Sequence, residues 1–316
     1  MKTGNKIITL TLNPSIDHIL TVKVLSLYNK NILTGKQVFY GGKGINAAFA
    51  LGKLGIPATA AGLIGAKDLS GVDKKLLNVG IKNAFLPFDG ITRSTYKIME
   101  SSTNHDTEFN QAGSRVSKKY VGDLVSHLHT LLNTHTWFAL CGSIPAGIPE
   151  DFYASLIERC KRSGVITCLD TSGEALKQGV RAAPNILRIN LSELGEISSR
   201  EITGIPDTIS AIRSLRENGI GTIVVSMGAE GALGYDGKNI WQVRVPQVKI
   251  YGLTGAGDAM TAGLIASFCQ GKSTADSLRF SSALATASTL NMEPGDFDDK
   301  NLKDIFKKTT IQEIVL

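Results

Sequence analysis

The alternation of short β-rich runs with longer amphipathic stretches constrains the fold of this chain more than any other feature of its sequence. The expected strands are apolar and β-branched and cover residues 7–12, 58–61, 137–140, 165–169, 186–189 and 222–226. Between them, apolar residues recur at three and four positions, as in residues 118–132, 151–162 and 207–217, which predicts helices. Repeated βαβ order predicts an α/β fold with a mostly parallel central sheet and helices on both faces.

Two segments interrupt this order. Residues 19–40 and 92–112 show polar and apolar residues alternating in short runs, without a helical pattern. We expect them to form a separate small β-sheet whose exposed apolar face acts as a lid, a dimer surface or both. The whole chain, residues 1–316, is then expected to form a single domain that carries this β lid.

Composition argues against several classes of function. No stretch approaches the roughly 18 apolar residues of a membrane span, so no membrane partner is expected. The net charge of +6 is dispersed without a run of like charges, which argues against nucleic acid and suits small polyanionic ligands. The four cysteines form no Cys-x-x-Cys pair and no secretory signal precedes them, so a cytoplasmic location is expected.

The strongest candidate for chemistry is the sequence Thr254-Gly255-Ala256-Gly257-Asp258, which a helical run follows. Glycines let a backbone approach an anion closely, and a helix N-terminus directs unpaired N–H groups and its positive dipole end at that anion. Asp258 would take the proton of an attacking hydroxyl while the turn stabilises a transferred phosphoryl group. The alternative from these letters alone is a Thr N-cap with an acidic residue in the first helical turn.

A second glycine-rich stretch, Gly41-Gly42-Lys43-Gly44, opens another helical pattern, and a lysine inside such a turn suits a phosphate ligand. Gly42, Gly44 and Ala47 also satisfy the dinucleotide fingerprint G-x-G-x-x-A, although the run before them belongs to the lid and not to a βαβ unit. Upstream, Asp17 follows the end of a strand and could accept hydrogen bonds from sugar hydroxyls.

Two further stretches have the position expected for the walls of a nucleotide site, because each follows an expected strand. They are Asn190-Leu191-Ser192-Glu193 and residues 226–231. Asn190 and Glu193 would share a helix face and could hold a hydrated Mg²⁺, an ion that keeps several waters. Helix capping and a glycine turn are the alternative explanations. The sequence contains neither a P-loop nor a protein-kinase catalytic loop.

Taken together and in this order, the motifs resemble the PfkB (ribokinase-like) carbohydrate kinase family, in the branch that holds 1-phosphofructokinase and tagatose-6-phosphate kinase. The resemblance covers nearly the whole chain and rests also on Thr92-Arg93, Thr107-Glu108-Phe109-Asn110 and Gly142-Ser143-Ile144-Pro145. It implies a ribokinase-like fold, a sugar-phosphate kinase that uses ATP and Mg²⁺, and a homodimer formed through the β lid. Fructose 1-phosphate is the expected substrate, with tagatose 6-phosphate and fructose 6-phosphate as alternatives.

The resemblance also implies roles for individual residues. Asp258 would be the catalytic base, and Gly255, Ala256 and Gly257 would form the anion hole. Substrate contacts are expected from Asp17, Gly42, Lys43, Asn46, Arg93, Glu108 and Asn110, with Lys43 and Arg93 as a clamp for the phosphate already on the sugar. ATP would contact Asn190, Ser226, Gly228, Glu230, Gly231, Gly257, Ser281 and Ser288, and Asn190 and Glu193 would reach Mg²⁺ through water.

Several positions depart from the pattern of this branch, among them Gln111-Ala112-Gly113-Ser114, where Pro-Gly-Pro is usual. Ile32 stands where an arginine is usual, Arg188-Ile189 replaces the Lys-Pro before Asn-x-x-Glu, and Gly252 stands where some members carry aspartate. A phosphate ligand is therefore expected to be missing, and a monovalent-cation site is not expected. Two other classes stay open, a dinucleotide-dependent oxidoreductase and a non-catalytic sugar-phosphate-binding protein. Asp258 favours an enzyme, because a binding protein needs no carboxylate at the anion hole.

Overall fold

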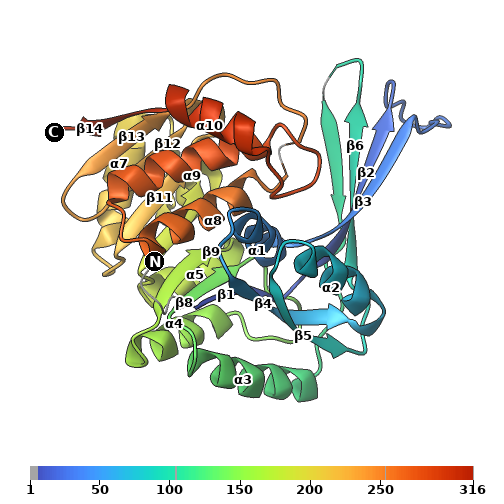
Figure 1. Cartoon of the computed structure of the whole chain (residues 1–316), viewed down its shortest axis with the longest axis horizontal. Helices are drawn as coiled ribbons and strands as arrows, with labels where there is room; N and C mark the ends of the chain where they lie inside the picture. The colour runs from blue at the N-terminus through green and yellow to red at the C-terminus, as the bar shows by residue number, and fades with distance from the viewer. Residues whose placement is uncertain (1–5, 104, 253, 316) are drawn as a thin grey trace.

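The computed structural model describes residues 6–103, 105–252 and 254–315 (Figure 1). The strands are β1 (Ile7–Thr11), β2 (Ser15–Val22), β3 (Gly35–Gly41), β4 (Ala58–Gly65), β5 (Lys82–Phe88), β6 (Arg93–Glu100), β7 (Asp106–Asn110), β8 (Trp137–Cys141), β9 (Ile166–Asp170), β10 (Ile186–Asn190), β11 (Thr222–Ser226), β12 (Ala232–Tyr235), β13 (Ile240–Arg244) and β14 (Thr310–Ile314). The helices are α1 (Lys43–Lys53), α2 (Leu69–Leu77), α3 (Lys118–Leu132), α4 (Phe152–Arg162), α5 (Gly173–Arg181), α6 (Leu191–Ser198), α7 (Ile205–Arg216), α8 (Ala256–Cys269), α9 (Thr274–Ser288) and α10 (Asp299–Lys308), with short 3₁₀ turns η1 (Ala66–Asp68) and η2 (Gly228–Glu230). None of the helices in the described ranges combines the length and the hydropathy that a bilayer span requires.

The large sheet has the strand order β14-β13-β12-β11-β10-β9-β8-β1-β4-β5. From β11 to β5 in this order every neighbouring pair is parallel, which confirms the predicted mostly parallel sheet. The other edge is antiparallel and consists of β12, β13 and β14. These three strands and β5 are absent from the predicted set. The sequences of β5, β13 and β14 mix polar with apolar residues, and β12 is only four residues long.

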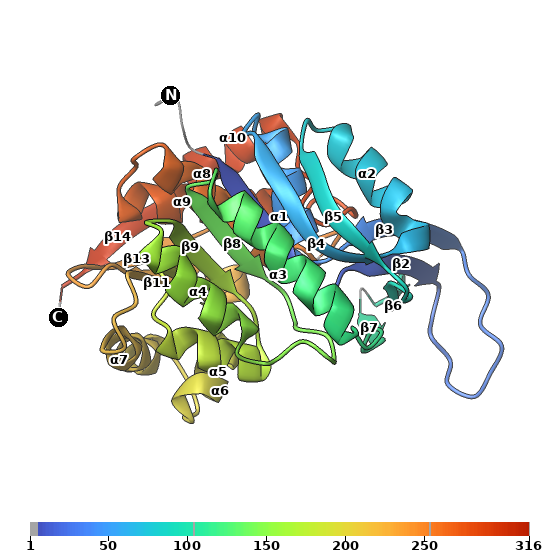
Figure 2. The same ribbon diagram turned by 90° about the horizontal axis from the view of Figure 1, so that it is seen from below.

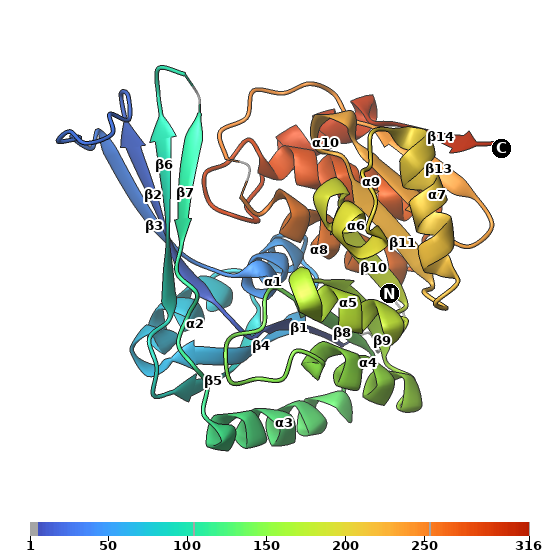
Figure 3. The same ribbon diagram turned by 180° about the vertical axis from the view of Figure 1, so that it is seen from behind.

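Helices cover both faces of the large sheet, as predicted (Figures 2 and 3). Successive residues of β1 point in opposite directions, so Ile7 joins the apolar cluster on one face and Ile8 the cluster on the other. The first cluster includes residues of α1, α2, α8, α9 and α10, and the second includes residues of α3, α4, α5, α6 and α7. Burial on both faces explains the unbroken apolar runs of the central strands.

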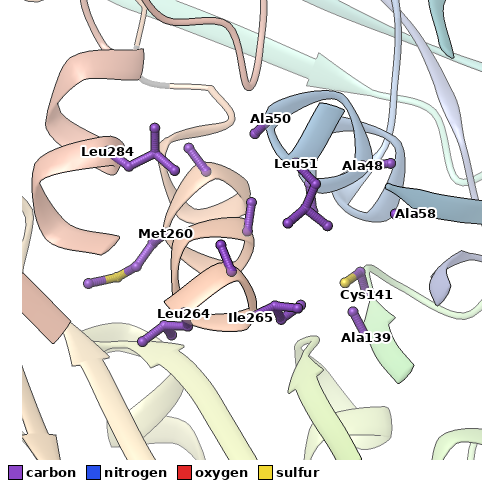
Figure 4. Close-up of a cluster of buried hydrophobic side chains, with 14 of the residues drawn as sticks. Ala48, Ala50, Leu51, Ala58, Ala139, Cys141, Met260, Leu264, Ile265 and Leu284 are labelled. Atoms are coloured by element: carbon purple, nitrogen blue, oxygen red, sulfur yellow. The ribbon is translucent and has the colours of Figure 1, made fainter. Parts of the chain in front are cut away.

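Helix α8 is buried along most of its length, since residues 258–267 are all buried. Its side chains lie between Leu51 of α1 and Leu284 of α9 (Figure 4). Packing of α8 on α1 brings the first turns of the two helices together, where Asn46 of α1 contacts Asp258 of α8. The hydrophobic core therefore sets the distance between two predicted site residues.

The small sheet, which we call the lid, has the order β3-β2-β6-β7. Strand β2 pairs antiparallel with β3 and parallel with β6, so two distant chain segments form one sheet that projects from the body (Figures 1 and 3). The lid strands begin at Ser15, before the predicted start at residue 19, and the last one ends at Asn110. Both predicted segments contribute strands without a helix, as expected.

Candidate active site

The candidate site lies at the carboxyl ends of the parallel strands, the edge at which α/β sheets bind ligands. Asp170 ends β9, Asn190 ends β10 and Ser226 ends β11, and these strands are neighbours in the sheet. The N-termini of α1 and α8 meet at the same edge and add unpaired backbone N–H groups. Residues from across the whole chain thus converge in one place.

Asp258 has the environment of a general base. It lies in the first turn of α8, is 6% exposed, and its Oδ2 accepts a hydrogen bond of 2.8 Å from Asn46 Nδ2. Burial and the negative charge of Asp170 raise the pKa of Asp258 to about 6, against the opposing effect of the Lys43 ammonium. Such a carboxyl group is mostly ionised at neutral pH and can accept a proton there.

Asp170 is missing from the predicted site, yet it is the centre of the charge network. Its carboxylate is fully buried and accepts hydrogen bonds from Lys43 Nζ at 2.7 Å and from Thr261 Oγ1 at 2.6 Å. Arg188 Nη1 lies 3.5 Å from Asp170 Oδ2. Burial alone would raise the pKa of Asp170, but Lys43 and Arg188 outweigh it and hold that pKa below the ordinary value. A charged residue at the end of an apolar strand is the signal that could have identified it.

The glycine turn before α8 has an arginine packed against it. Gly255 is the N-cap of α8 and has φ +86°, a backbone conformation that side chains with a Cβ rarely adopt. A Cβ at Gly257 would lie 2.5 Å from Arg188 Nη1, so only glycine lets the guanidinium come this close. Arg188 also donates from Nη2 to Ser226 Oγ at 2.8 Å. Arg188, which replaces the lysine usual in this branch, therefore keeps a positive charge beside the glycine turn.

Lys43 and Arg93, predicted as a two-cation clamp, have different surroundings. Lys43 is bound by Asp170 and lies 3.7 Å from Glu193 Oε1. Burial would lower the pKa of the Lys43 ammonium, but these two carboxylates outweigh it and raise that pKa. Arg93 instead donates from Nε to the backbone oxygen of Asn13 at 3.3 Å, beyond the end of β1. Their joint role stays a prediction.

Asn190 and Glu193 form a capping box at the start of α6. Asn190 Oδ1 accepts from the Glu193 backbone N–H, and Glu193 Oε2 accepts from the Asn190 backbone N–H. Among the described residues no group of three or more His, Cys, Asp and Glu side chains could hold a metal ion. An ion such as Mg²⁺ would therefore need water and phosphate oxygens for most of its ligands.

A cavity of about 230 Å³ adjoins the glycine turn. Of the predicted ATP contacts, Ser226, Gly228, Gly231 and Gly257 line it, whereas Asn190 and Glu230 do not. Ser281 and Ser288 do not line it either, and their hydroxyls donate to Leu278 O and Ala285 O of their own helix. The described residues of α9 and its C-terminal end that line it are Ser282, Ala285, Thr286 and Thr289.

The side of the site facing the lid is rich in hydrogen-bonding groups. Asp17 Oδ1 accepts from Ser15 Oγ and Thr95 Oγ1, both at 2.6 Å. Asn46 Oδ1 is buried and has no hydrogen-bond partner among the described residues. On β7, Glu108 and Asn110 are exposed, and Asn110 Nδ2 donates to Glu108 Oε1 at 2.9 Å. A ligand with several hydroxyl groups would complement this surface.

Because Asp258 can take a proton while the turn beside it can hold an anion, the site is that of a phosphotransferase that acts on an alcohol group. The chain belongs to the pfkB family of carbohydrate kinases, whose profile, described as pfkB family carbohydrate kinase, matches residues 10–300. The ribokinase-like fold and the kinase class predicted from the sequence are thereby confirmed, and the oxidoreductase alternative is wrong.

Individual relatives resemble this chain over nearly its full length. It is 31% identical to the 1-phosphofructokinase of Rhodobacter capsulatus over 310 residues, 98% of each chain. It is 32% identical to the 1-phosphofructokinase of Borreliella burgdorferi, over 93% of this chain and 94% of the relative. Among solved structures, phosphofructokinase-2 from Escherichia coli in complex with substrates and products matches with a TM-score of 0.88 at 26% identity, covering 96% of this chain and 98% of the other.

Proposed function

We propose that this protein transfers the γ-phosphoryl group of ATP to a hydroxyl of fructose 1-phosphate and so forms fructose 1,6-bisphosphate. The observation that carries the proposal is the pair formed by Asn46 and Asp258. Asn46 donates to the Asp258 carboxylate, while its buried Oδ1 has no partner among the described residues. A buried acceptor without a partner is costly, so a sugar hydroxyl that donates to it is a favourable ligand.

In this mechanism the lid presents the sugar and the glycine turn presents the phosphoryl group. Asp17, Gly42 and Asn46 hold the sugar hydroxyls, with Glu108 and Asn110 as further contacts from β7. Asp258 accepts the proton as the hydroxyl oxygen bonds to the γ-phosphorus and ADP leaves. N–H groups of residues 255–257 and the Arg188 guanidinium stabilise the charge on the transferred oxygens.

The two predicted clamp residues take separate roles in this proposal. Arg93 binds the phosphate already on the sugar, since a guanidinium can donate two parallel N–H bonds to phosphate. Lys43 shares Asp170 with Arg188 and therefore adds positive charge beside the transferred group. This assignment changes the role of Lys43 from the one that the family resemblance implies.

ATP is assigned to the cavity beside the glycine turn, where Ser226, Gly228 and Gly231 face α9. Magnesium neutralises phosphate charge when it is bound. We assign its protein contacts to Asn190 and Glu193 through water, because the capping box leaves Glu193 Oε1 directed toward Lys43 and the phosphate region.

We also propose a homodimer that forms through the outer face of the lid. The strand register places Val38, His18, Tyr96 and Phe109 in one row across the four strands. His18 stacks on Tyr96 at 4.7 Å, while Val38 and Phe109 are 45% and 56% exposed. Such an apolar row on a small sheet suits burial against a second copy. If Phe109→Asp leaves the sedimentation coefficient unchanged, this interface is wrong.

The substrate assignment is tested by ADP production with fructose 1-phosphate, fructose 6-phosphate, tagatose 6-phosphate and the corresponding free sugars. We expect the highest kcat/KM with fructose 1-phosphate. A higher kcat/KM with another sugar phosphate would change the assigned substrate but not the kinase activity. No ADP production with any of these sugars contradicts the proposed function. NAD should give no thermal stabilisation, in contrast to ATP.

A further inference from the structure

Lys97 on β6 is a lysine of the lid whose burial needs an explanation. Lysine side chains are rarely buried unless they are paired, yet Lys97 is only 8% exposed. Because residues alternate sides along a strand, Arg93, Thr95 and Lys97 point to the same face of the lid. Thr95 donates to Asp17, so this is the face assigned to the sugar.

Two contacts hold the Lys97 ammonium group. Its Nζ lies 2.5 Å from Asp106 Oδ2 on β7 and donates to Thr254 Oγ1 at 3.2 Å. Thr254 directly precedes Gly255, the N-cap of α8. One ammonium group therefore joins two lid strands to the turn that is assigned to the transferred phosphoryl group.

We propose that Lys97 is a positioning residue that fixes the distance between the sugar face of the lid and the anion-hole turn. The inference rests on the proposed kinase function, in which Asp17 on the lid holds the sugar and residues 255–257 hold the phosphoryl group. Alignment of the hydroxyl oxygen with phosphorus then depends on how these two parts are held together. A misplacement of about 1 Å can reduce the rate by about 10²-fold.

Other contacts attach the lid to the body, so Lys97 is expected to set the position of the lid and not its attachment. Lys75 of α2 donates to the backbone oxygen of Tyr40 at 2.9 Å and pairs with Glu293 at 3.0 Å, which anchors the base of β3. The side chain of Asp106 is 41% exposed, so its ion pair with Lys97 contributes little to stability. The lid is therefore expected to stay folded and attached when Lys97 is replaced.

The test compares Lys97→Met with Lys36→Met, an exposed lysine on β3 of the same sheet. In Lys97→Met we expect kcat to fall about 10- to 100-fold with KM for ATP within about twofold of wild type, and Lys36→Met to behave as wild type. Thr254→Val removes the same contact from the other side. The double variant should then be no slower than the slower single variant.

Hydrogen exchange adds a measurement that needs no turnover. In the protein without ligands, backbone N–H groups of β6, β7 and residues 255–258 should exchange faster in Lys97→Met and not in Lys36→Met. Kinetics use whichever sugar phosphate the wild type turns over fastest, so an error in the proposed sugar does not affect the outcome. Unchanged exchange, or a double variant whose loss is the product of the two single losses, overturns the inference.

Discussion

Replacing Asp258 by asparagine should lower activity and raise stability. The burial that raises the pKa of this base also destabilises its ionised form in the folded protein. A rise in the pKa of Asp258 from 3.8 to about 6 corresponds to a cost of about 3 kcal/mol for the ionised group in the folded protein. Asp258→Asn removes that charge, and its amide oxygen can still accept a hydrogen bond from Asn46. We therefore expect kcat to fall by about 10² to 10⁴ while the folded state gains stability.

The gain should depend on pH with a definite sign. The folded protein binds the Asp258 proton more tightly than the unfolded chain does, so the cost is full above pH about 6 and vanishes below the ordinary pKa near 4. Urea unfolding at pH 8 should show Asp258→Asn more stable by up to about 3 kcal/mol, a value that already includes the favourable charges of Lys43 and Arg188. Near pH 4 the two proteins should be equally stable.

Asp170→Asn is the matched control, since it removes a second buried carboxylate whose pKa is lowered and not raised. Its pKa is held below the ordinary value by Lys43 and Arg188, so its loss leaves two cations without their partner and should destabilise the protein by about 3 to 5 kcal/mol at pH 8. An Asp258→Asn protein that is less stable than wild type at pH 8, with a difference that does not shrink toward pH 4, refutes the reasoning. A near wild-type kcat in Asp258→Asn also refutes the assignment of Asp258 as the base.

Three further outcomes follow from the site. The value of kcat/KM should fall about tenfold per pH unit below pH 6, where Asp258 becomes protonated, and a flat profile from pH 5 to 7 would exclude it as the base. Arg93→Ala should lower kcat/KM for fructose 1-phosphate roughly 10- to 100-fold with little effect on free fructose, and an unchanged preference for the phosphorylated sugar would show that Arg93 is not the clamp. Excess EDTA should abolish turnover and added Mg²⁺ should restore it, so activity that persists in EDTA contradicts the metal requirement.

The central strands and the glycine turns could be predicted because their physical causes are local. A strand buried on both faces is mostly apolar, as in Ile223, Val224 and Val225 of β11, and such a run is visible in the sequence. Likewise, Gly255 precedes α8 with a positive φ that only glycine readily adopts, so the glycine is visible in the sequence at the start of the helix. Edge strands such as β14 escape prediction because one side of each faces solvent and their residues are mixed.

Long-range geometry accounts for what the sequence did not reveal. The contact between Lys43 and Asp170 spans 127 positions and exists only because β9 lies near α1 in the folded sheet. The pattern of α9 predicts a helix but not its rotation about its axis. Ser282 and Thr286 therefore line the cavity, in place of the predicted Ser281 and Ser288. The N-x-x-E spacing fits both a metal site and a capping box, and only the coordinates show the capping box.

The way the chain builds the lid has a consequence for its kinetics. The chain enters this sheet at Ser15, leaves it at Gly41, returns at Arg93 and leaves again at Asn110. The parallel ladder from Ser15 and Arg93 to Val22 and Glu100 joins the two passages along the whole length of β2. Neither hairpin can swing alone without breaking that ladder, so the two hairpins are expected to move as one unit when the lid opens for substrate.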